Sequence, residues 1–186
     1  MEQPGVRDPA PAPLDLVQDL VNTVDLEGGD EGWRTPGDLT DWVRARGIAT
    51  GDLDADVLAR ALVLREALRD VCSAHAGADV PADALRDLNA LLTAAPLRLV
   101  ADGEGGAAVR AADGLTGLPA LTAEVAAAVA AAVADGSWQR LKACAADTCR
   151  WVYYDRSPAG RSRWCTMAIC GSRAKMRSYR RRRTTA

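Results

Sequence analysis

Apolar residues recur at helical spacing over most of the first 136 positions of the chain. In the longest such stretch, residues 54–76, Ala61, Leu64 and Leu68 fall three or four residues apart and therefore share one face of a helix. The same spacing predicts further helices over residues 13–26, 35–48, 81–95 and 119–135. In the helix over 81–95, the residues expected to face inward are Leu85, Leu88 and Leu92. The pattern predicts one compact, mostly helical domain over residues 14–136.

The period changes from helical to alternating between the last two of these helices. Leu97, Leu99 and Ala101 alternate with Arg98 and Val100, as expected of a strand. Glycines at 103–106 then separate this run from a return segment through residue 109. We therefore expect one small β-hairpin beside the helices.

A second change follows residue 136, where the segments become short. Residues 137–144, with the sequence SWQRLKAC, predict a short helix. The aromatic run at 150–154 predicts a strand, and 161–164 can be its return strand. Residues 171–183 permit a final helix. We expect these segments, over 137–186, to form a separate small module.

Charge divides the chain at the same place. Residues 1–136 hold 10 arginines and 23 acidic residues, whereas residues 137–186 hold 13 basic residues and two acidic ones. This division indicates an acidic globular part followed by a part that attracts polyanions. Residues 1–13, with four prolines, predict a disordered N-terminus.

The most apolar stretch, residues 118–134, predicts a buried or semi-buried helix and no membrane span. It consists mostly of alanine, contains Glu124 and lacks basic flanks. The first 13 residues carry no secretory signal pattern. We therefore expect a protein of the cytoplasm of a bacterium-like cell, where clustered cysteines indicate a metal more than disulfides.

Four of the five cysteines form two equally spaced pairs. Cys144 and Cys149 are separated by four residues, and so are Cys165 and Cys170. Such pairs, about 15–20 residues apart, are typical of a tetrahedral zinc site. Four thiolates leave no open position, so the expected Zn²⁺ is single and structural. The alternatives are two disulfides or four unrelated buried cysteines.

The order of knuckle, hairpin and helix around these cysteines matches a treble-clef finger. A module this small needs the metal to hold it together. Its expected apolar core is Trp151, Tyr153, Trp164, Met167, Ile169 and Met176.

Residues 138–182, which contain all four cysteines together with YDRS, SRWC and RAK, strongly resemble the CGNR zinc finger. The family is named for a Cys-Gly-Asn-Arg motif at the fourth cysteine. Ser172 stands here in the place of that asparagine, between Gly171 and Arg173, and serine can cap a helix start. Upstream, LDLVQDLVNTVD resembles the ABATE domain that usually precedes this finger. The resemblance implies a bacterial transcription regulator, often linked to stress.

Basic residues on the finger are the candidate contacts to nucleic acid. They are Arg161, Arg163, Arg173, Lys175, Arg177, Arg180 and Arg181. On a helix, Arg173, Arg177 and Arg180 share one face, which can meet phosphates or enter a major groove. We expect DNA as the partner. RNA or the ribosome, another protein, and an intramolecular contact with the acidic domain are alternatives, and the last suggests autoinhibition.

The helical domain contains weaker candidates for binding a small-molecule effector. Asn22, Thr23, Trp33 and Trp42 can line a pocket, although tryptophans are more often core residues and Asn22 and Thr23 can bond a neighbouring loop. With one histidine, no paired-carboxylate motif and a closed metal site, we expect no enzyme activity. No heptad seam is evident, so a monomer remains compatible with the sequence.

Overall fold

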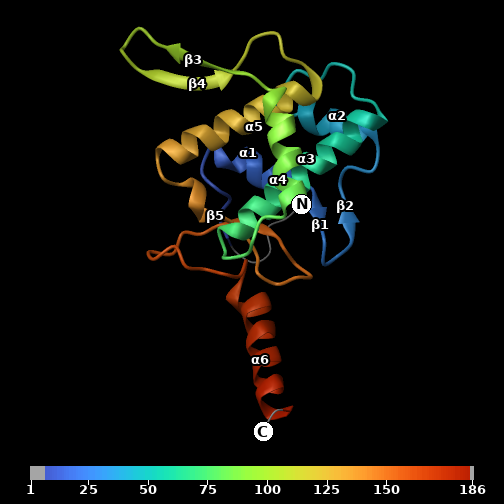
Figure 1. Cartoon of the computed structure of the whole chain (residues 1–186), viewed down its shortest axis with the longest axis vertical. Helices are drawn as coiled ribbons and strands as arrows, with labels where there is room; N and C mark the ends of the chain where they lie inside the picture. Colours follow the sequence, from blue (N-terminus) through green and yellow to red (C-terminus); the bar gives the residue numbers. More distant parts are fainter. Residues whose placement is uncertain (1–6, 185–186) are drawn as a thin grey trace.

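A body of packed helices carries a β-hairpin at one end and a projecting helix at the other (Figure 1). The computed structural model describes residues 7–184. The elements of the body are α1 Leu14–Val21, β1 Val24–Asp25, β2 Asp30–Glu31, α2 Pro36–Arg44, α3 Ala55–Ala74, α4 Ala82–Thr93, β3 Leu97–Ala101, β4 Ala107–Ala111 and α5 Gly117–Ala134. The elements that follow are η1 Trp138–Arg140, β5 Leu141–Ala143, β6 Val152–Tyr154, the π-helical turn η2 Met167–Gly171 and α6 Ser172–Thr184. About half of the chain is helical, as expected.

Local capping explains where two of the predicted helices begin. Thr35 and Asp38 form a capping box at the start of α2, in which each side chain accepts a hydrogen bond from the other residue's backbone N–H. Asp54 accepts from the backbone N–H of Val57 at 2.9 Å and caps α3. These caps satisfy N–H groups that have no partner within the helix.

The main core is built around α3, which packs against α1, α2, α4, α5 and β5. Its fully buried members include Val17, Leu20, Leu64 and Leu121. By length and composition α5 is apolar enough to cross a membrane, but 56% of it is buried inside the fold. This observation agrees with the prediction of a core helix for residues 118–134.

Two details of burial differ from the periodic pattern. In α4, Leu88 and Leu91 are buried, whereas Leu85 is 47% exposed, so the prediction that Leu85 faces inward is wrong. On α3, Arg65 and Arg69 are buried within the apolar face. Both differences arise because the neighbouring elements, not the helix alone, determine which side is covered.

Three antiparallel strand pairs are present in the described residues, where the sequence predicts one hairpin in the body and one in the finger. The predicted hairpin of the body is β3 with β4, in which Leu97 pairs with Ala111 and Ala101 with Ala107. The predicted helix over 137–144 is present only as the 3-10 turn η1, and it is wrong for Leu141–Ala143, which form β5 and pair with β6. Residues 161–164 form no strand. The finger hairpin therefore encloses the first cysteine pair instead of connecting the two pairs.

Strand β6 lies between two cores. Val152 belongs to the main core, together with Leu141 and Ala143 of β5. Its neighbours Trp151 and Tyr153 belong to a second core around the four cysteines, with Trp164 packed against it. Because side chains of a strand alternate between its two faces, one short strand joins the finger to the body.

The chain before α1 lies against this finger core. Residues 1–6 of the predicted disordered segment are outside the described residues. The guanidinium of Arg7 lies over the ring of Tyr153, 4.6 Å from its centroid, and donates to the carbonyl oxygens of Tyr154 and Trp164. Ala10 is buried, and its backbone N–H donates to Gln18.

Candidate metal centre and nucleic-acid interface

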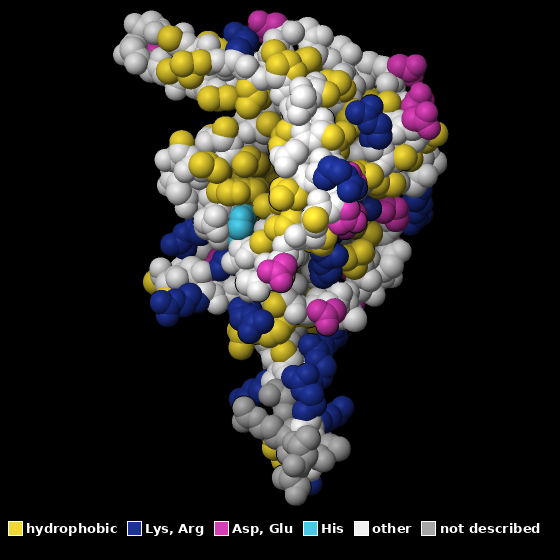
Figure 2. All heavy atoms as spheres, in the orientation of Figure 1, with side chains coloured by type: hydrophobic (Ala, Val, Ile, Leu, Met, Phe, Trp, Pro, Cys, Tyr) yellow, Lys and Arg dark blue, Asp and Glu magenta, His cyan; other side chains and the backbone are white. Residues whose placement is uncertain are grey.

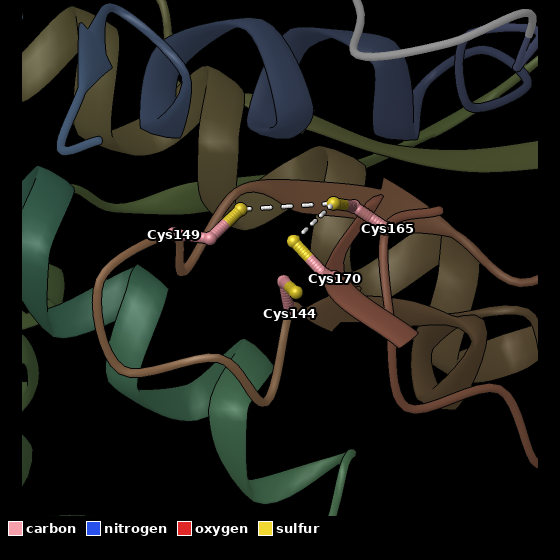
Figure 3. A group of neighbouring side chains, drawn as sticks. All are labelled: Cys144, Cys149, Cys165 and Cys170. Atoms are coloured by element: carbon pink, nitrogen blue, oxygen red, sulfur yellow. Dashed lines mark hydrogen bonds between the residues drawn. The ribbon is translucent and has the colours of Figure 1, made fainter. Parts of the chain in front are cut away.

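The four clustered cysteines point toward one another (Figure 3). Their Sγ atoms all lie within 4.8 Å of one another, and all four residues are buried. The Sγ atom of Cys165 is 3.6 Å from those of Cys149 and Cys170. Four sulfurs held tetrahedrally by Zn²⁺ at 2.3 Å are about 3.8 Å apart. The observed arrangement therefore fits one zinc ion held by Cys144, Cys149, Cys165 and Cys170.

Backbone hydrogen bonds shape the loop that presents the first two cysteines. Cys144 follows β5, and its N–H donates to the carbonyl of Trp151 at 2.9 Å. The N–H groups of Cys149 and Arg150 both donate to Ala146, and Arg150 adopts a left-handed φ of 47°. Ala145 donates to Arg163 at 2.8 Å, and this bond brings the second cysteine pair to the first.

The thiols of the cluster differ in their pKa. Hydrogen bonds from the Cys149 and Cys165 thiols lower the pKa of Cys144. The same hydrogen bonding with Cys144 raises the pKa of Cys149 to about 12, and burial raises the pKa of Cys170. Four adjacent thiolates repel one another, so a divalent ion is needed to deprotonate the set. The ion supplies cross-linking and charge, and four protein ligands make it structural.

Residues around the fourth cysteine explain part of the finger signature. The Thr166 hydroxyl accepts from the N–H of Ile169 and caps η2. A Cβ on Gly171 would lie 2.7 Å from Sδ of Met167 and 3.3 Å from Trp164, so a side chain here would displace the end of the Met167 side chain and press on Trp164. The hydroxyl of Ser172 donates to the carbonyl of Met167 at 3.0 Å. The expectation that Ser172 caps the helix start is therefore wrong, and Thr166 is the cap.

A buried ion pair organises the turn between β6 and the second cysteine pair. Lys142 Nζ donates to the Asp155 carboxylate at 3.0 Å and also to the carbonyl of Gly160. The same carboxylate accepts from Ser157 and from the N–H of Ser162. Although burial raises the pKa of Asp155, these hydrogen bonds lower it well below its usual range. This pair was not predicted from the sequence, where the Asp and Ser of YDRS were the available signal.

The finger expected to act as a separate module is hydrogen-bonded to the body through buried groups. Asn22 Nδ2 donates to the carbonyl of Val152 at 2.7 Å, and its Oδ1 accepts from the Val152 N–H at 2.9 Å. Gln18 Nε2 donates to the same carbonyl at 3.1 Å. Asn22 therefore bonds the finger, in keeping with the expectation that it can bond a neighbouring loop.

Side chains of α3 and its C-terminal end hold the finger hairpin from the other side. The fully buried Arg69 donates to the carbonyl oxygens of Arg150 and Val21 at 3.0 and 2.6 Å. His75 Nδ1 lies 2.7 Å from the carbonyl of Leu141, so it carries a proton and donates. The sequence signal for this contact was a pair of charged residues inside the apolar pattern of 54–76. These are Arg65 and Arg69, which lie one helical turn apart.

All seven basic residues predicted to contact nucleic acid are exposed. Arg161 and Arg163 lie on the loop before Cys165, whereas the others lie on α6. Lys and Arg side chains line this helix, which extends away from the body, while most Asp and Glu side chains on the same face lie on the body (Figure 2). The structure therefore brings five of the seven onto one projecting helix.

Arg173 forms an ion pair with the first domain. Its guanidinium contacts the carboxylate of Glu27, which lies in the loop between β1 and β2. This hydrogen bond raises the pKa of Arg173. Both side chains remain partly exposed, at 54% and 39%. One residue of the basic face is thus engaged by an acid of the body.

The four candidates for ligand binding line one pocket. Asn22 and Thr23 come from the end of α1, Trp33 follows β2 and Trp42 lies on α2. The pocket has a volume of about 340 Å³. The rings of Trp33 and Trp42 meet edge to face, 5.3 Å between centroids. The structure therefore brings these four together, although Trp33 also belongs to the main core.

Two family models match the chain, one over the helical domain and one over the finger that follows it. Residues 14–136, well over half of the chain, match the model described as "ABATE: Putative stress-induced transcription regulator". Residues 140–183 match the model of the CGNR zinc finger. No curated protein matches the chain in sequence.

Proposed function

Because the chain belongs to the ABATE family and carries a CGNR zinc finger after that domain, we propose that it is a zinc-containing transcription regulator whose finger binds duplex DNA. The observation that carries this proposal is the projecting, arginine-rich helix held at its base by four cysteines. A rigid cationic helix can meet phosphates and present arginines to base edges.

The body supplies the regulatory half of this proposal. It holds a pocket lined by Trp33 and Trp42, and the wall residue Asn22 is hydrogen-bonded to the finger. We propose that the helical domain senses a ligand or mediates interactions. We propose that the chain acts by binding instead of catalysis, because its metal site offers four protein ligands and His75 is engaged with Leu141. Its proposed location is the bacterial cytoplasm, as expected from the sequence.

The test is binding of zinc-loaded, full-length protein to labelled duplex DNA of random sequence, followed by selection of enriched sequences. Affinity is expected to fall steeply with salt, since arginines release counterions from phosphates. Replacing Arg173, Arg177 and Arg180 by Ala should reduce the slope of log K against log salt by about 2–3. The matched control replaces the exposed body residues Arg34, Arg44 and Arg60 by Ala and should leave the slope unchanged.

Competition with RNA distinguishes the second candidate. The basic helix also suits A-form or single-stranded RNA, because phosphate contacts alone do not select DNA. Preference for RNA competitors would favour the ribosome or another RNA. A binding constant independent of salt, or equal binding by the triple variant, would contradict nucleic-acid binding and favour a protein partner.

A further inference from the structure

Between α1 and α2 the structure assigns a site for a small planar organic cation, of the amidine or guanidine class, next to Trp42. Two neighbouring hollows meet there, with volumes of about 340 and 590 Å³. Arg46 and Asp19 line both of them. The inference concerns a ligand of the body and does not depend on DNA binding by the finger.

Arg46 itself shows which chemistry the site accepts. Its guanidinium carbon lies 3.6 Å from the centroid of the Trp42 ring, in cation–π geometry. Its Nη2 donates to the carboxylate of Asp19 at 3.0 Å, and its Nη1 donates to the carbonyl of Trp42 at 3.2 Å. An aromatic face, a carboxylate and a carbonyl therefore converge on one planar cation.

The charge of the lining selects a cation over an anion. Among the residues that line the two hollows, Asp15, Asp19, Asp38 and Glu124 are acidic and Arg46 is basic. Asp38 is committed to the cap of α2, whereas Asp15, Asp19 and Glu124 all line the larger of the two hollows. These carboxylates would repel an anionic ligand, whereas they would attract a cation.

Arg46 can exchange its place with a ligand cation. Its side chain is 28% exposed and that of Asp19 is 48% exposed, so water can solvate the guanidinium once it leaves, and the ligand restores the contacts to Trp42 and Asp19 that Arg46 gives up. Its long side chain can swing into solvent, and its departure would join the two hollows into one groove beside Trp42. A ligand cation would then take the place of the guanidinium on the same ring and carboxylate.

The experiment uses three probes of nearly equal shape on the zinc-loaded, full-length protein. Benzamidine carries a planar cation, benzamide is neutral and benzoate is an anion. Binding is followed through the indole N–H signals of Trp33 and Trp42 in NMR titrations. Benzamidine should bind at least about tenfold more tightly than the other two, because only it gains cation–π and carboxylate contacts.

Variants separate this site from nonspecific binding. Arg46→Ala should tighten benzamidine binding by about fivefold, because the competing internal cation is removed. Trp42→Leu and Asp19→Asn should each weaken it by a similar factor. Arg44→Ala, which removes an exposed arginine from the same helix, is the matched control and should have no effect.

The inference is overturned if benzamide binds as tightly as benzamidine, or if Arg46→Ala weakens the binding of benzamidine. Preference for benzoate would overturn it as well, since Arg46 would then be the ligand contact. If Trp42→Leu does not fold, as judged by circular dichroism, Asp19→Asn and Arg46→Ala still decide the outcome, because both side chains lie at the surface.

Discussion

A single asparagine bonds both backbone groups of the first residue of strand β6. Asn22 pairs with the N–H and the carbonyl of Val152, and all of these atoms are buried. A buried backbone group without a partner costs roughly 1–3 kcal/mol. The side chain of Asn22 thus links the end of α1 to β6 in a way that apolar packing cannot replace.

We predict that Asn22→Ala lowers the free energy of unfolding by about 2–4 kcal/mol, since it leaves the Val152 N–H unpaired and creates a small cavity. Urea denaturation followed by circular dichroism measures the loss. Asn89→Ala, at an exposed position of α4, is the control and should change stability little. A loss no larger than in that control would show that the two hydrogen bonds contribute nothing.

His75 makes stability depend on pH. Burial lowers its pKa below the ordinary value near 6.5, and the charge of Lys142 lowers it further, although the hydrogen bond to Leu141 opposes both. A group with a lowered pKa binds its proton more readily in the unfolded state. Its contribution is therefore complete above about pH 6.5 and is lost as pH falls from there toward the folded pKa.

The zinc-loaded wild type should consequently lose more stability between pH 7 and pH 5 than His75→Gln, which cannot titrate. Urea midpoints of both proteins across this range measure the difference. Protonation of the zinc ligands affects both proteins equally, so the difference between them isolates the histidine. Parallel pH profiles would exclude this role.

At the scale of elements, different parts of the molecule stabilise the two halves of the finger: the body stabilises the strands, and the zinc site stabilises the helix. Strands β5 and β6 contribute Leu141, Ala143 and Val152 to the main core, so the body holds them. Helix α6 projects from the body (Figure 1), and a helix of 13 residues is only marginally stable by itself in water. Its order depends on Cys165, Cys170 and the metal.

We predict that Cys165→Ser abolishes stoichiometric zinc and lowers hydrogen-exchange protection in residues 165–184, while α1, α3 and α5 stay protected. Mass spectrometry of the native protein and hydrogen exchange measure both effects. Cys72→Ser is the matched control: Cys72 is buried in the main core and does not belong to the cluster of four cysteines, so its variant should keep one zinc. Full zinc in Cys165→Ser would refute the four-cysteine site.

Elements were predictable where a long segment carries its own periodicity. The helix over 54–76 and the hairpin around residues 103–106 follow from local pattern and from glycine placement. Residues 141–143 were predicted to be helical, because a segment of three residues is too short to show the alternation that identifies a strand. Their strand conformation comes from pairing with Val152–Tyr154, which local propensity does not include.

At the scale of the whole molecule, the acidic body contacts the basic helix through Glu27 and Arg173. Glu27→Gln removes this pair and frees Arg173 for phosphate. We predict a rise in affinity for DNA of at most about fivefold at low salt, because exposed ion pairs are weak. The rise should disappear at high salt, where exposed charges are screened.

Fluorescence anisotropy with labelled duplex DNA measures this effect. Glu104→Gln, which removes one negative charge from the turn between β3 and β4, corrects for the change in net charge. Equal affinities of the two variants would show that the Glu27 contact does not restrain the finger. Autoinhibition would then have no support from this ion pair.

The sequence by itself determined the metal ligands, the main helices and the division of charge, because each depends on residue type and on short-range spacing. Four cysteines in two equal pairs define the zinc site without knowledge of the fold. Only the tertiary structure decided that Arg69 is buried, that Asn22 bonds the finger, that Glu27 meets Arg173 and that Arg46 stacks on Trp42. These contacts join residues far apart in the chain or depend on what covers a surface, and neither property is contained in local pattern.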